Sequence, residues 1–325
     1  MSTEFELIAR LKPLLPTSAR VVVGAGDDCA VLDLGEPGMQ GLFKTDAVVE
    51  GVHFTADVAP ERVGHKALGR CLSDIAAMGG EPTAAVITLA LPGLDPDAEA
   101  AWALRAYEGL TALAARWGVA VVGGETTRNP AALLLSVALL GRVPAGKALL
   151  RTGSCVGDAI FVSGELGGSL TGRHLDFEPR LAEGRWLRET GRVHALLDVS
   201  DGLAGDLPHL LNPLGTMGAV LYKSALPISR AARLAARTGD LAKPAHLAAL
   251  TDGEDFELLF TVAPRDAVAV MDGWRERFPG VPLSCIGRVT ATAGVRLRDE
   301  HGERPLTARG FDHFAKLPAG TASAN

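Results

Sequence analysis

The chain alternates short apolar runs with longer segments in which apolar residues recur every three or four positions. Short apolar runs between turn residues are typical of strands, and the longer period is typical of amphipathic helices. Their alternation predicts an α/β (α+β) fold. In the first half the pattern predicts strands at Val21–Val23, Ala30–Leu32, Leu42–Thr45, Ala84–Leu91, Ala120–Val122 and Leu133–Leu140, and helices at Phe5–Leu15, Pro60–Met78 and Asp97–Trp117.

The second half repeats this alternation after Gly141–Ser154, a segment with Pro and Gly between two apolar stretches. A length of 325 residues favours two domains, and we place them at 1–143 and 144–325. The pattern predicts strands at Ala159–Ser163, Ala195–Val199, Ala219–Tyr222, Phe256–Val262 and Leu283–Val289, and helices at Arg180–Thr190, Leu203–Leu211, Leu226–Arg237 and Arg265–Phe278.

Composition excludes several classes of protein. A formal net charge of −6 without a basic tract is a poor basis for general nucleic-acid binding. No stretch approaches the ~18 consecutive apolar residues of a membrane span. The N-terminal residues include Glu4 and Glu6 and lack the basic start of a signal peptide, so we expect a cytoplasmic protein. The four cysteines form no CxxC pair, which argues against a zinc site.

A recurring feature is an acidic residue that lies next to Gly, Ser or Thr and close to an apolar run. The end of a strand delivers such side chains to one edge of a sheet, where open α/β sheets bind ligands. We therefore expect these acids to converge. The segments are Gly24–Leu32, Lys44–Phe54, Leu72–Gly79, Gly123–Arg128, Leu197–Leu203 and Thr251–Phe260.

Converging carboxylates need cations or protons. Two carboxylates ~5 Å apart repel by roughly 3 kcal/mol at an effective dielectric near 20, and several such pairs would offset much of a domain's net stability of ~5–15 kcal/mol. Hard oxygen ligands without His or Cys neighbours select Mg²⁺, Mn²⁺ or Ca²⁺. Because Mg²⁺ usually lies between carboxylates and substrate phosphates, the pattern favours phosphoryl chemistry on a nucleotide.

Each segment also has a simpler interpretation. Asp-Gly and Ser-Asp-Gly are ordinary turn and helix-cap signals. Asp74 could be a polar residue on a helix, and Asp206 is best interpreted that way. The Gly-rich Gly164–Gly172 could wrap phosphates through its N–H groups or form a plain flexible turn. The chain contains neither a P-loop nor the set of protein-kinase loops, so the joint occurrence of the acidic segments carries the prediction.

Taken in order along the chain, these strings resemble the thiamine-monophosphate kinases. The resemblance covers nearly the whole chain, and TD-x-x-V-EGVHF together with SDIAAMG-x-EP favours this branch of the aminoimidazole ribonucleotide synthetase-like superfamily. The matching strings are GAGDDCAVL, TDAVVEGVHF, ALGRCLSDIAAMGGEP, GVAVVGGETTR, LLRTGSCVGDAIFVSG, LLDVSDGLAGDL, DGEDFELLF, IGRV and GFDHF.

The resemblance implies a kinase that uses ATP and Mg²⁺ to convert thiamine monophosphate into thiamine diphosphate. It also implies an N-terminal mixed sheet that forms a barrel in a homodimer, a C-terminal α/β domain, and an active site in the cleft between the domains. Mg²⁺ ligands would be Asp27, Thr45, Asp46, Asp74, Glu125, Asp198 and Asp201. The nucleotide would contact Tyr107, Gly124, Glu125, Arg151 and Ser200, and the thiamine phosphate would contact His53, Glu254 and Phe311.

Several of these residues have ordinary alternatives. His53 could be a buried, hydrogen-bonded histidine, and Tyr107 could belong to the core of its helix. Arg151 could form a surface ion pair, and Phe311 could pack in a C-terminal cluster.

The implied chemistry needs no general base. A phosphate monoester has a second pKa near ~6, so its oxygen is already anionic at neutral pH. We therefore expect direct in-line transfer without a phosphoenzyme, with Arg151 adding positive charge near the nucleotide phosphates.

The chain departs from the family pattern at four places. Glu125 stands where the family usually has Asp, and Lys44 stands where it commonly has a small hydroxyl residue. Asp252 and Phe256 replace commoner residues in DGEDFELL. The stretch Gly164–Arg180 is short and lacks most of a helix, which could alter the nucleotide pocket or the domain contact.

Two other functions remain open at this level. A related enzyme of the aminoimidazole ribonucleotide synthetase type would activate a carbonyl oxygen and release free phosphate. A non-catalytic paralogue would bind nucleotide without turnover. The acidic segments argue against this function, because carboxylates that repel one another would destabilise a protein that did not use them.

Overall fold

The computed structural model describes residues 4–211, 215–239, 243–308 and 310–311, whose strands form two sheets. The first sheet has the order β1-β2-β3-β6-β4-β5. It is mixed, because β4 and β5 run parallel while the other neighbours run antiparallel. Its strands are β1 (Val21–Val23), β2 (Ala30–Leu32), β3 (Met39–Val49), β4 (Glu81–Leu91), β5 (Ala120–Arg128) and β6 (Leu134–Pro144).

Helices α2 (Pro60–Ala77) and α3 (Pro96–Trp117) cover one face of this sheet, and α1 (Glu4–Leu11) with η1 (Lys12–Leu14) precedes it. Asp95 caps α3 by accepting a hydrogen bond from the Ala98 N–H. The two large helices pack closely, since a Cβ on Gly64 would lie 1.8 Å from the Ala106 carbonyl oxygen. None of the helices in the described ranges is long and apolar enough to cross a bilayer.

The second sheet has the order β13-β12-β9-β11-β7-β10-β8, and only its β9–β12 pair is parallel. Its strands are β7 (Ala159–Ser163), β8 (Val193–Asp198), β9 (Gly218–Tyr222), β10 (Leu258–Val262), β11 (Leu283–Thr290), β12 (Gly294–Asp299) and β13 (Gly302–Pro305). The helical segments are η2 (Ser169–Thr171), α4 (Arg173–Asp176), α5 (Leu181–Thr190), α6 (Leu203–Leu210), η3 (Lys223–Ala225), α7 (Arg230–Thr238), α8 (Ala245–Thr251) and α9 (Pro264–Arg277).

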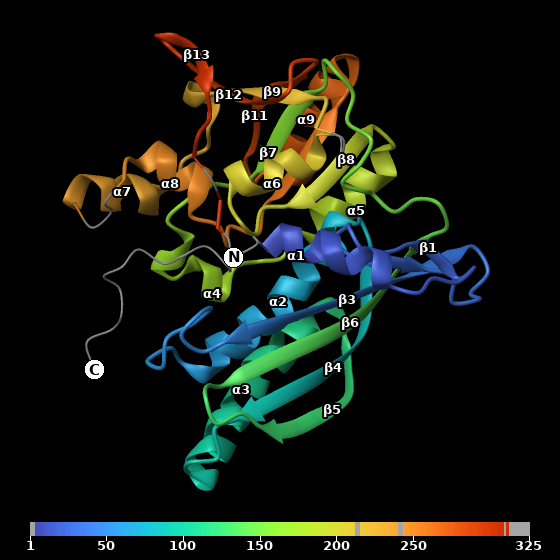
Figure 1. The fold of residues 1–325 in the computed structure, drawn as a ribbon, viewed down its shortest axis with the longest axis vertical. Coiled ribbons are helices and arrows are strands. Elements are labelled where there is room, and N and C mark those ends of the chain that lie inside the picture. The colour runs from blue at the N-terminus through green and yellow to red at the C-terminus, as the bar shows by residue number, and fades with distance from the viewer. Residues whose placement is uncertain (1–3, 212–214, 240–242, 309, 312–325) are drawn as a thin grey trace.

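The sheets form separate halves, and α2 lies between them (Figure 1). Helix α2 contacts β3 and β6 on one side and α4, α5 and β8 on the other. One hydrophobic core runs from the first sheet through α2 to Phe161 and Phe260 of the second, and another packs α6 against the second sheet. Residues on α2 therefore face the boundary between the halves.

The two-sheet α/β architecture agrees with the predicted fold class, but several predicted strands were too short. Strand β3 extends to Val49, and β5 continues through Gly123 and Gly124 to Arg128. Only Gly fits at position 124 of this strand, because a Cβ there would lie 1.9 Å from the Ile87 carbonyl oxygen. Helix α8 and strands β12 and β13 had not been predicted, and α7 begins only after Ser229, whose hydroxyl accepts from Ala232 N–H.

Candidate active site

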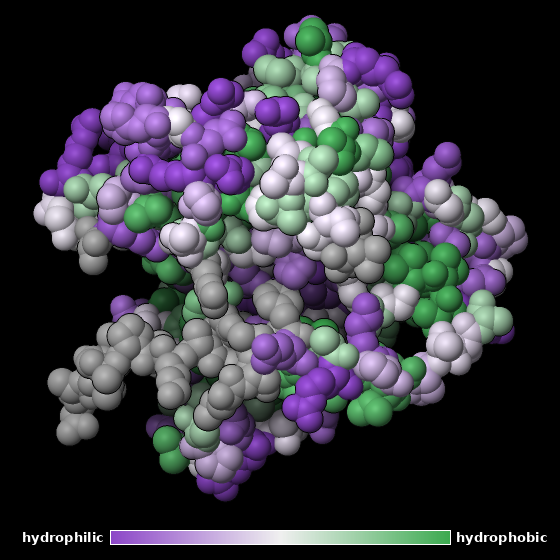
Figure 2. Space-filling model, turned by 45° about the horizontal axis from the view of Figure 1, so that its top comes forward, coloured by the Kyte–Doolittle hydropathy of each residue, from purple (hydrophilic) through white to green (hydrophobic). Residues whose placement is uncertain are grey.

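Three buried carboxylates form an acid cluster where the two halves meet. Asp28 follows the Gly24–Gly26 turn, Asp74 lies in the last turns of α2, and Asp198 ends β8. Ligand oxygens of all three lie within 4.8 Å of one another. These residues come from three of the acidic segments that we expected to converge, but in the first segment we had predicted Asp27 as the ligand and the structure places Asp28 in the cluster. A hydrophilic recess between the halves is visible in Figure 2.

Positively charged and hydroxyl groups surround the acid cluster. Lys44 Nζ lies 3.0 Å from Asp74 Oδ1. The Ser73 hydroxyl donates to Asp198 Oδ2 at 2.5 Å, and Arg151 Nε donates to Asp28 Oδ1 at 3.1 Å. The Lys44 departure from the family pattern therefore places an ammonium group inside the acid cluster.

These cations do not fully neutralise the acids. Burial, followed by the charge of Asp28, raises the pKa of Asp198 to about 6. The same two causes raise the pKa of the neighbouring Asp27 to about 6. Burial also raises the pKa of Asp74, against the attraction of Lys44. The site accordingly favours protons or further cations, which is the electrostatic demand inferred from the sequence.

The acid cluster fits a hard divalent cation. Asp28 Oδ2 is buried and accepts no hydrogen bond from the described residues. This oxygen is therefore available to coordinate a cation. The donor set consists of carboxylate oxygens only, which suits Mg²⁺ better than zinc or copper.

Two further predicted ligands lie on β3, and the strand separates them. Asp46 faces α2, where Arg70 Nε and Nη2 donate to its two oxygens at 3.0 and 3.1 Å. Thr45 points to the opposite, exposed face, with its hydroxyl 3.4 Å from Ser136 Oγ. Successive side chains of a strand alternate between faces. The structure therefore does not bring the Thr45 side chain to the acid cluster, and our assumption that these residues end a strand was wrong.

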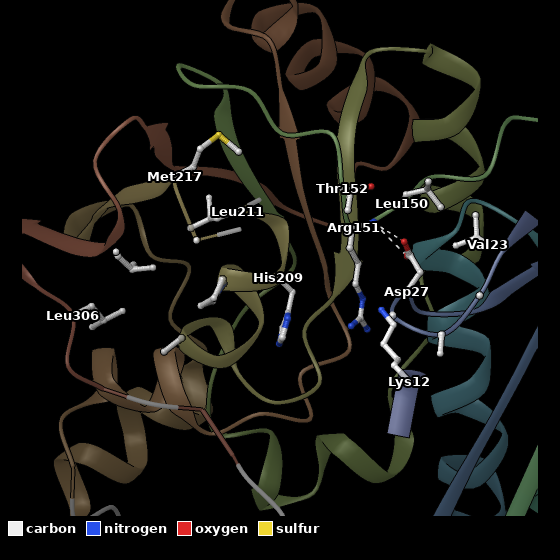
Figure 3. Close-up of a pocket in the computed structure, with 18 of the residues that line it drawn as sticks. Lys12, Val23, Asp27, Leu150, Arg151, Thr152, His209, Leu211, Met217 and Leu306 are labelled. Carbon is white, nitrogen blue, oxygen red and sulfur yellow. Dashed lines mark hydrogen bonds between the residues drawn. The ribbon is translucent and has the colours of Figure 1, made fainter. Parts of the chain in front are cut away.

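A cavity of about 690 Å³ opens beside Asp27 and Arg151 (Figure 3). Both Asp27 oxygens accept from the Arg151 backbone N–H at 3.2 and 3.3 Å. The side chains of Lys12, Arg151 and His209 extend into this space, and apolar residues such as Leu211 form the opposite wall. A cavity with cationic groups at one end and apolar walls at the other suits a nucleotide.

A smaller cavity of about 110 Å³ lies beside the loop that follows Asp198. His53 and Glu254, expected at the thiamine phosphate, line it together with the described Phe311. Ser200 and Asp201 line it as well, although we had expected Ser200 at the nucleotide. The Phe311 N–H donates to the Asp201 carbonyl at 2.9 Å, which holds the end of the described chain against this loop.

Glu254 is bound by three cationic or hydrogen-bonding partners that the sequence analysis had missed. Lys66 Nζ donates to Glu254 Oε2 at 2.6 Å and also to the His53 carbonyl. Arg70 Nη1 donates to Glu254 Oε1 at 3.2 Å, and His174 Nδ1 lies 2.9 Å from Oε2. Burial raises the pKa of Glu254, but these partners outweigh it and hold the pKa at about 2. No local signal in the sequence points to these contacts, because α2 carries other charged residues as well, among them Glu61, Arg62 and Asp74.

Glu254 is also held in a costly backbone conformation. Its φ is 51°, in the left-handed region that residues with a side chain seldom adopt. Phe256 has the same φ and stacks on Phe177 at 4.0 Å between ring centroids. Such strain persists where surrounding contacts determine the conformation, and it is common at functional sites.

The Gly-rich turn does not offer all its N–H groups to a phosphate. Gly167 N–H donates to both oxygens of Asp255 at 3.0 Å, and Gly168 N–H donates to Asp252 at 2.7 Å. These bonds favour the interpretation of Gly164–Gly172 as a structural turn. The end of this turn forms η2, and α4 follows it with His174 Nδ1 2.8 Å from Lys66 Nζ of α2. This segment therefore forms part of the contact between the halves and of the smaller cavity, whose lining includes Leu170.

Three predicted nucleotide residues lie away from both cavities. Tyr107 packs on α3 against the first core, whereas Gly124 and Glu125 belong to the exposed edge strand β5. None of them lines either cavity in the described chain. The sequence had grouped them with Arg151 by motif alone.

Asp206 has a structural role beyond that of a polar helix residue. It is buried, and its Oδ2 accepts the Asp201 backbone N–H at 2.9 Å. Asp206 does lie on a helix, α6, as we had interpreted it, and its carboxylate also fixes the loop that carries Asp201.

Comparison with known proteins is consistent with this geometry. Residues 26–143 match the model of the AIR synthase related protein N-terminal domain family. The chain is 38% identical to the thiamine-monophosphate kinase of Rhodopirellula baltica, over 95% of this chain and 97% of that protein.

Solved structures agree. The structure of AaThiL complexed with AMPPCP and TMP matches with a TM-score of 0.79 at 30% identity, over 96% of this chain and 97% of that one. Thiamine-monophosphate kinase from Stenotrophomonas maltophilia K279a matches with a TM-score of 0.70 at 34% identity, over 90% and 96%. These matches confirm the resemblance found in the motifs, and the chain belongs to the thiamine-monophosphate kinase family.

Proposed function

We propose that this enzyme transfers a phosphoryl group from ATP to thiamine monophosphate, giving ADP and thiamine diphosphate. The observation that carries the proposal is the position of the acid cluster. Through Arg151 it adjoins the larger cavity, and through the Asp198–Asp201 loop it adjoins the smaller one. A nucleotide in the larger cavity and an acceptor in the smaller one would each direct their phosphates toward Asp28, Asp74 and Asp198.

Asp28, Asp74 and Asp198 would hold Mg²⁺, with Asp27, Asp46 and Asp201 at the edge of the same site. When bound, Mg²⁺ neutralises phosphate oxygens and allows two anions to approach each other. Thr45 and Glu125 remain proposed ligands on sequence grounds alone, since this chain does not bring their side chains to the acid cluster.

The residues of the chain supply positioning and charge. Arg151 is anchored on Asp28 and lines the larger cavity, so its guanidinium can contact nucleotide phosphates. Asp27 accepts the Arg151 backbone N–H and fixes that segment. The acceptor oxygen is anionic at neutral pH, and direct in-line transfer therefore needs no proton acceptor. His53, Glu254 and Phe311 would bind the thiamine phosphate.

We also propose that the enzyme is a homodimer formed through the first sheet, with domains divided near residue 143. The sheet face opposite α2 and α3 exposes Phe43, Val86 and Val122 at 45%, 43% and 65%. Exposed apolar faces of this kind mark contact surfaces. A cytoplasmic location stays a prediction.

The decisive experiment measures ADP release with thiamine monophosphate, with thiamine, and with buffer alone, and follows products by ³¹P NMR. We expect Mg²⁺-dependent turnover with the monophosphate only, and a new diphosphate signal. Free phosphate as the sole product would instead indicate chemistry of the aminoimidazole ribonucleotide synthetase type. Nucleotide binding without turnover of any thiamine phosphate would indicate a non-catalytic paralogue.

A further inference from the structure

The smaller cavity has an unbalanced set of charges for a site that receives a phosphate. Its lining includes three carboxylates, those of Asp201, Asp252 and Glu254. An anionic ligand entering such a space would be repelled unless cations faced it. Among the described residues that line the cavity, Arg70 is the one with a permanent positive charge.

Two of the lining carboxylates already have cations behind them. Lys243 Nζ lies 2.6 Å from Asp252 Oδ1, and Lys66 Nζ lies 2.6 Å from Glu254 Oε2. Neither lysine lines the cavity itself. They reduce the negative charge of the walls without offering a hydrogen bond to a ligand.

Arg70 does have donors left for a ligand. A guanidinium carries five N–H groups, and the hydrogen bonds of Arg70 to described residues use one on each nitrogen, to Asp46 and Glu254. Two N–H groups therefore remain, one on each terminal nitrogen. The Arg70 side chain is 13% exposed, and the bonds to Asp46 and Glu254 fix its plane beside the cavity.

We propose that Arg70 binds the phosphate of the acceptor through these two N–H groups and so selects a phosphorylated acceptor over an unphosphorylated one. This rests on the proposed function. The fixed fork of a guanidinium matches two oxygens of a phosphate, which a lysine ammonium cannot do. Asp46 and Glu254 hold the guanidinium in place before the acceptor arrives, which lowers the entropic cost of binding. Arg70 is thus a determinant of acceptor specificity contributed by α2.

The test compares two ligands that differ only in the phosphate. Isothermal titration calorimetry would measure dissociation constants for thiamine monophosphate and thiamine, in Mg²⁺ buffer without nucleotide. In Arg70→Met we expect monophosphate binding to weaken roughly 10- to 100-fold, with thiamine binding unchanged. Arg70→Lys should restore part of the difference, because it keeps the charge and loses the fork. Arg62→Met is the matched control on the same helix, since Arg62 pairs with Asp176 and does not line the cavity.

The outcomes separate this inference from the proposed function. Equal weakening for both ligands would assign Arg70 a structural role and overturn the inference, as would unchanged binding of both. Where Arg70→Met fails to fold, Arg70→Lys decides, and an unchanged ratio of the two dissociation constants overturns the proposal. A wild-type enzyme that turns over no thiamine monophosphate defeats the proposed function itself, whatever the variants bind.

Discussion

The buried acid cluster and the half-buried Glu254 are both carboxylate sites at the contact between the two halves, yet their pKa values shift in opposite directions. Burial and the neighbouring Asp28 raise the pKa of Asp198 to about 6. At Glu254, burial acts in the same sense, but His174, Lys66 and Arg70 reverse it and lower the pKa to about 2.

The difference lies in how many cations the chain itself supplies. Glu254 is a single carboxylate with Lys66 and Arg70 bonded to it. In the acid cluster, several carboxylates share Lys44 and Arg151, and Asp28 Oδ2 has no hydrogen-bond donor among the described residues. The charge of Glu254 is therefore neutralised by cations of the fold itself, whereas the acid cluster needs further cations from outside the chain.

The largest expected effect comes from removing the cation that completes Glu254. Lys66→Met leaves a buried carboxylate with one strong partner fewer, and breaking a buried pair in this way costs about 3–5 kcal/mol. Urea denaturation would measure the free energy of unfolding. Arg105→Met removes a pair with Glu61 that is exposed on both sides, and it should leave the unfolding midpoint nearly unchanged. Equal effects of the two variants would contradict the comparison.

The acid cluster should respond to the opposite kind of change. Asp198→Asn removes one charge from a crowded set and keeps an acceptor for the Ser73 hydroxyl. We expect turnover to fall roughly 100-fold, while the free energy of unfolding in EDTA stays the same or rises. Asp158→Asn is the control, because Asp158 is equally buried but bonds to His194 and the Cys155 N–H outside the acid cluster. An Asp198→Asn enzyme that loses stability in EDTA while keeping its turnover would reverse the assigned roles.

The pH dependence of stability should distinguish Glu254 as well. Its folded pKa is about 2 against an ordinary 4.5, so its contribution is present above pH 4.5 and is lost as pH falls through that window. At about 1.4 kcal/mol per pKa unit, the wild type should lose about 2 kcal/mol more than Glu254→Gln between pH 5 and pH 3. Urea midpoints for both proteins across that range provide the measurement, and parallel curves would exclude the assigned partners.

Sequence reasoning named Asp74, Asp198 and Arg151 from their motifs, but it missed Lys66 and Arg70, the cations that bind Glu254. For the first acidic segment it named Asp27, whereas the structure places the neighbouring Asp28 in the acid cluster. Lys66 and Arg70 meet Glu254 across 188 and 184 positions, and nothing near either residue in the sequence points to that contact.

Strand length limited the rest of the site prediction. The predicted strand that ended at Thr45 gave no reason to separate Thr45 from Asp46, whereas β3 continues to Val49 and its alternation puts them on opposite faces. Likewise the predicted strand Ala120–Val122 stopped before Gly123 and Gly124, whereas β5 continues through them to Arg128. Gly124 has no Cβ, so it can pair closely with the backbone of Ile87 in the parallel strand β4. In both strands the polar and Gly residues did not mark the end of the strand, as the sequence analysis had assumed.

The smallest effect concerns Lys44, the cation within the acid cluster. Asp74 and Asp46 keep the pKa of Lys44 above its ordinary value although burial lowers it, so the ammonium acts as a fixed internal cation 3.0 Å from Asp74. In EDTA, Lys44→Ser should lower the melting temperature by roughly 2–4 °C, because the acids lose that compensation. Added Mg²⁺ should narrow the gap, since an external cation then replaces the lost charge and binds the variant more tightly. Differential scanning calorimetry with and without Mg²⁺ gives both values, with the exposed Lys147→Ser as control. A deficit that Mg²⁺ leaves unchanged would mean that Lys44 stabilises the site by packing, and the acid cluster would then differ from Glu254 in geometry rather than in charge.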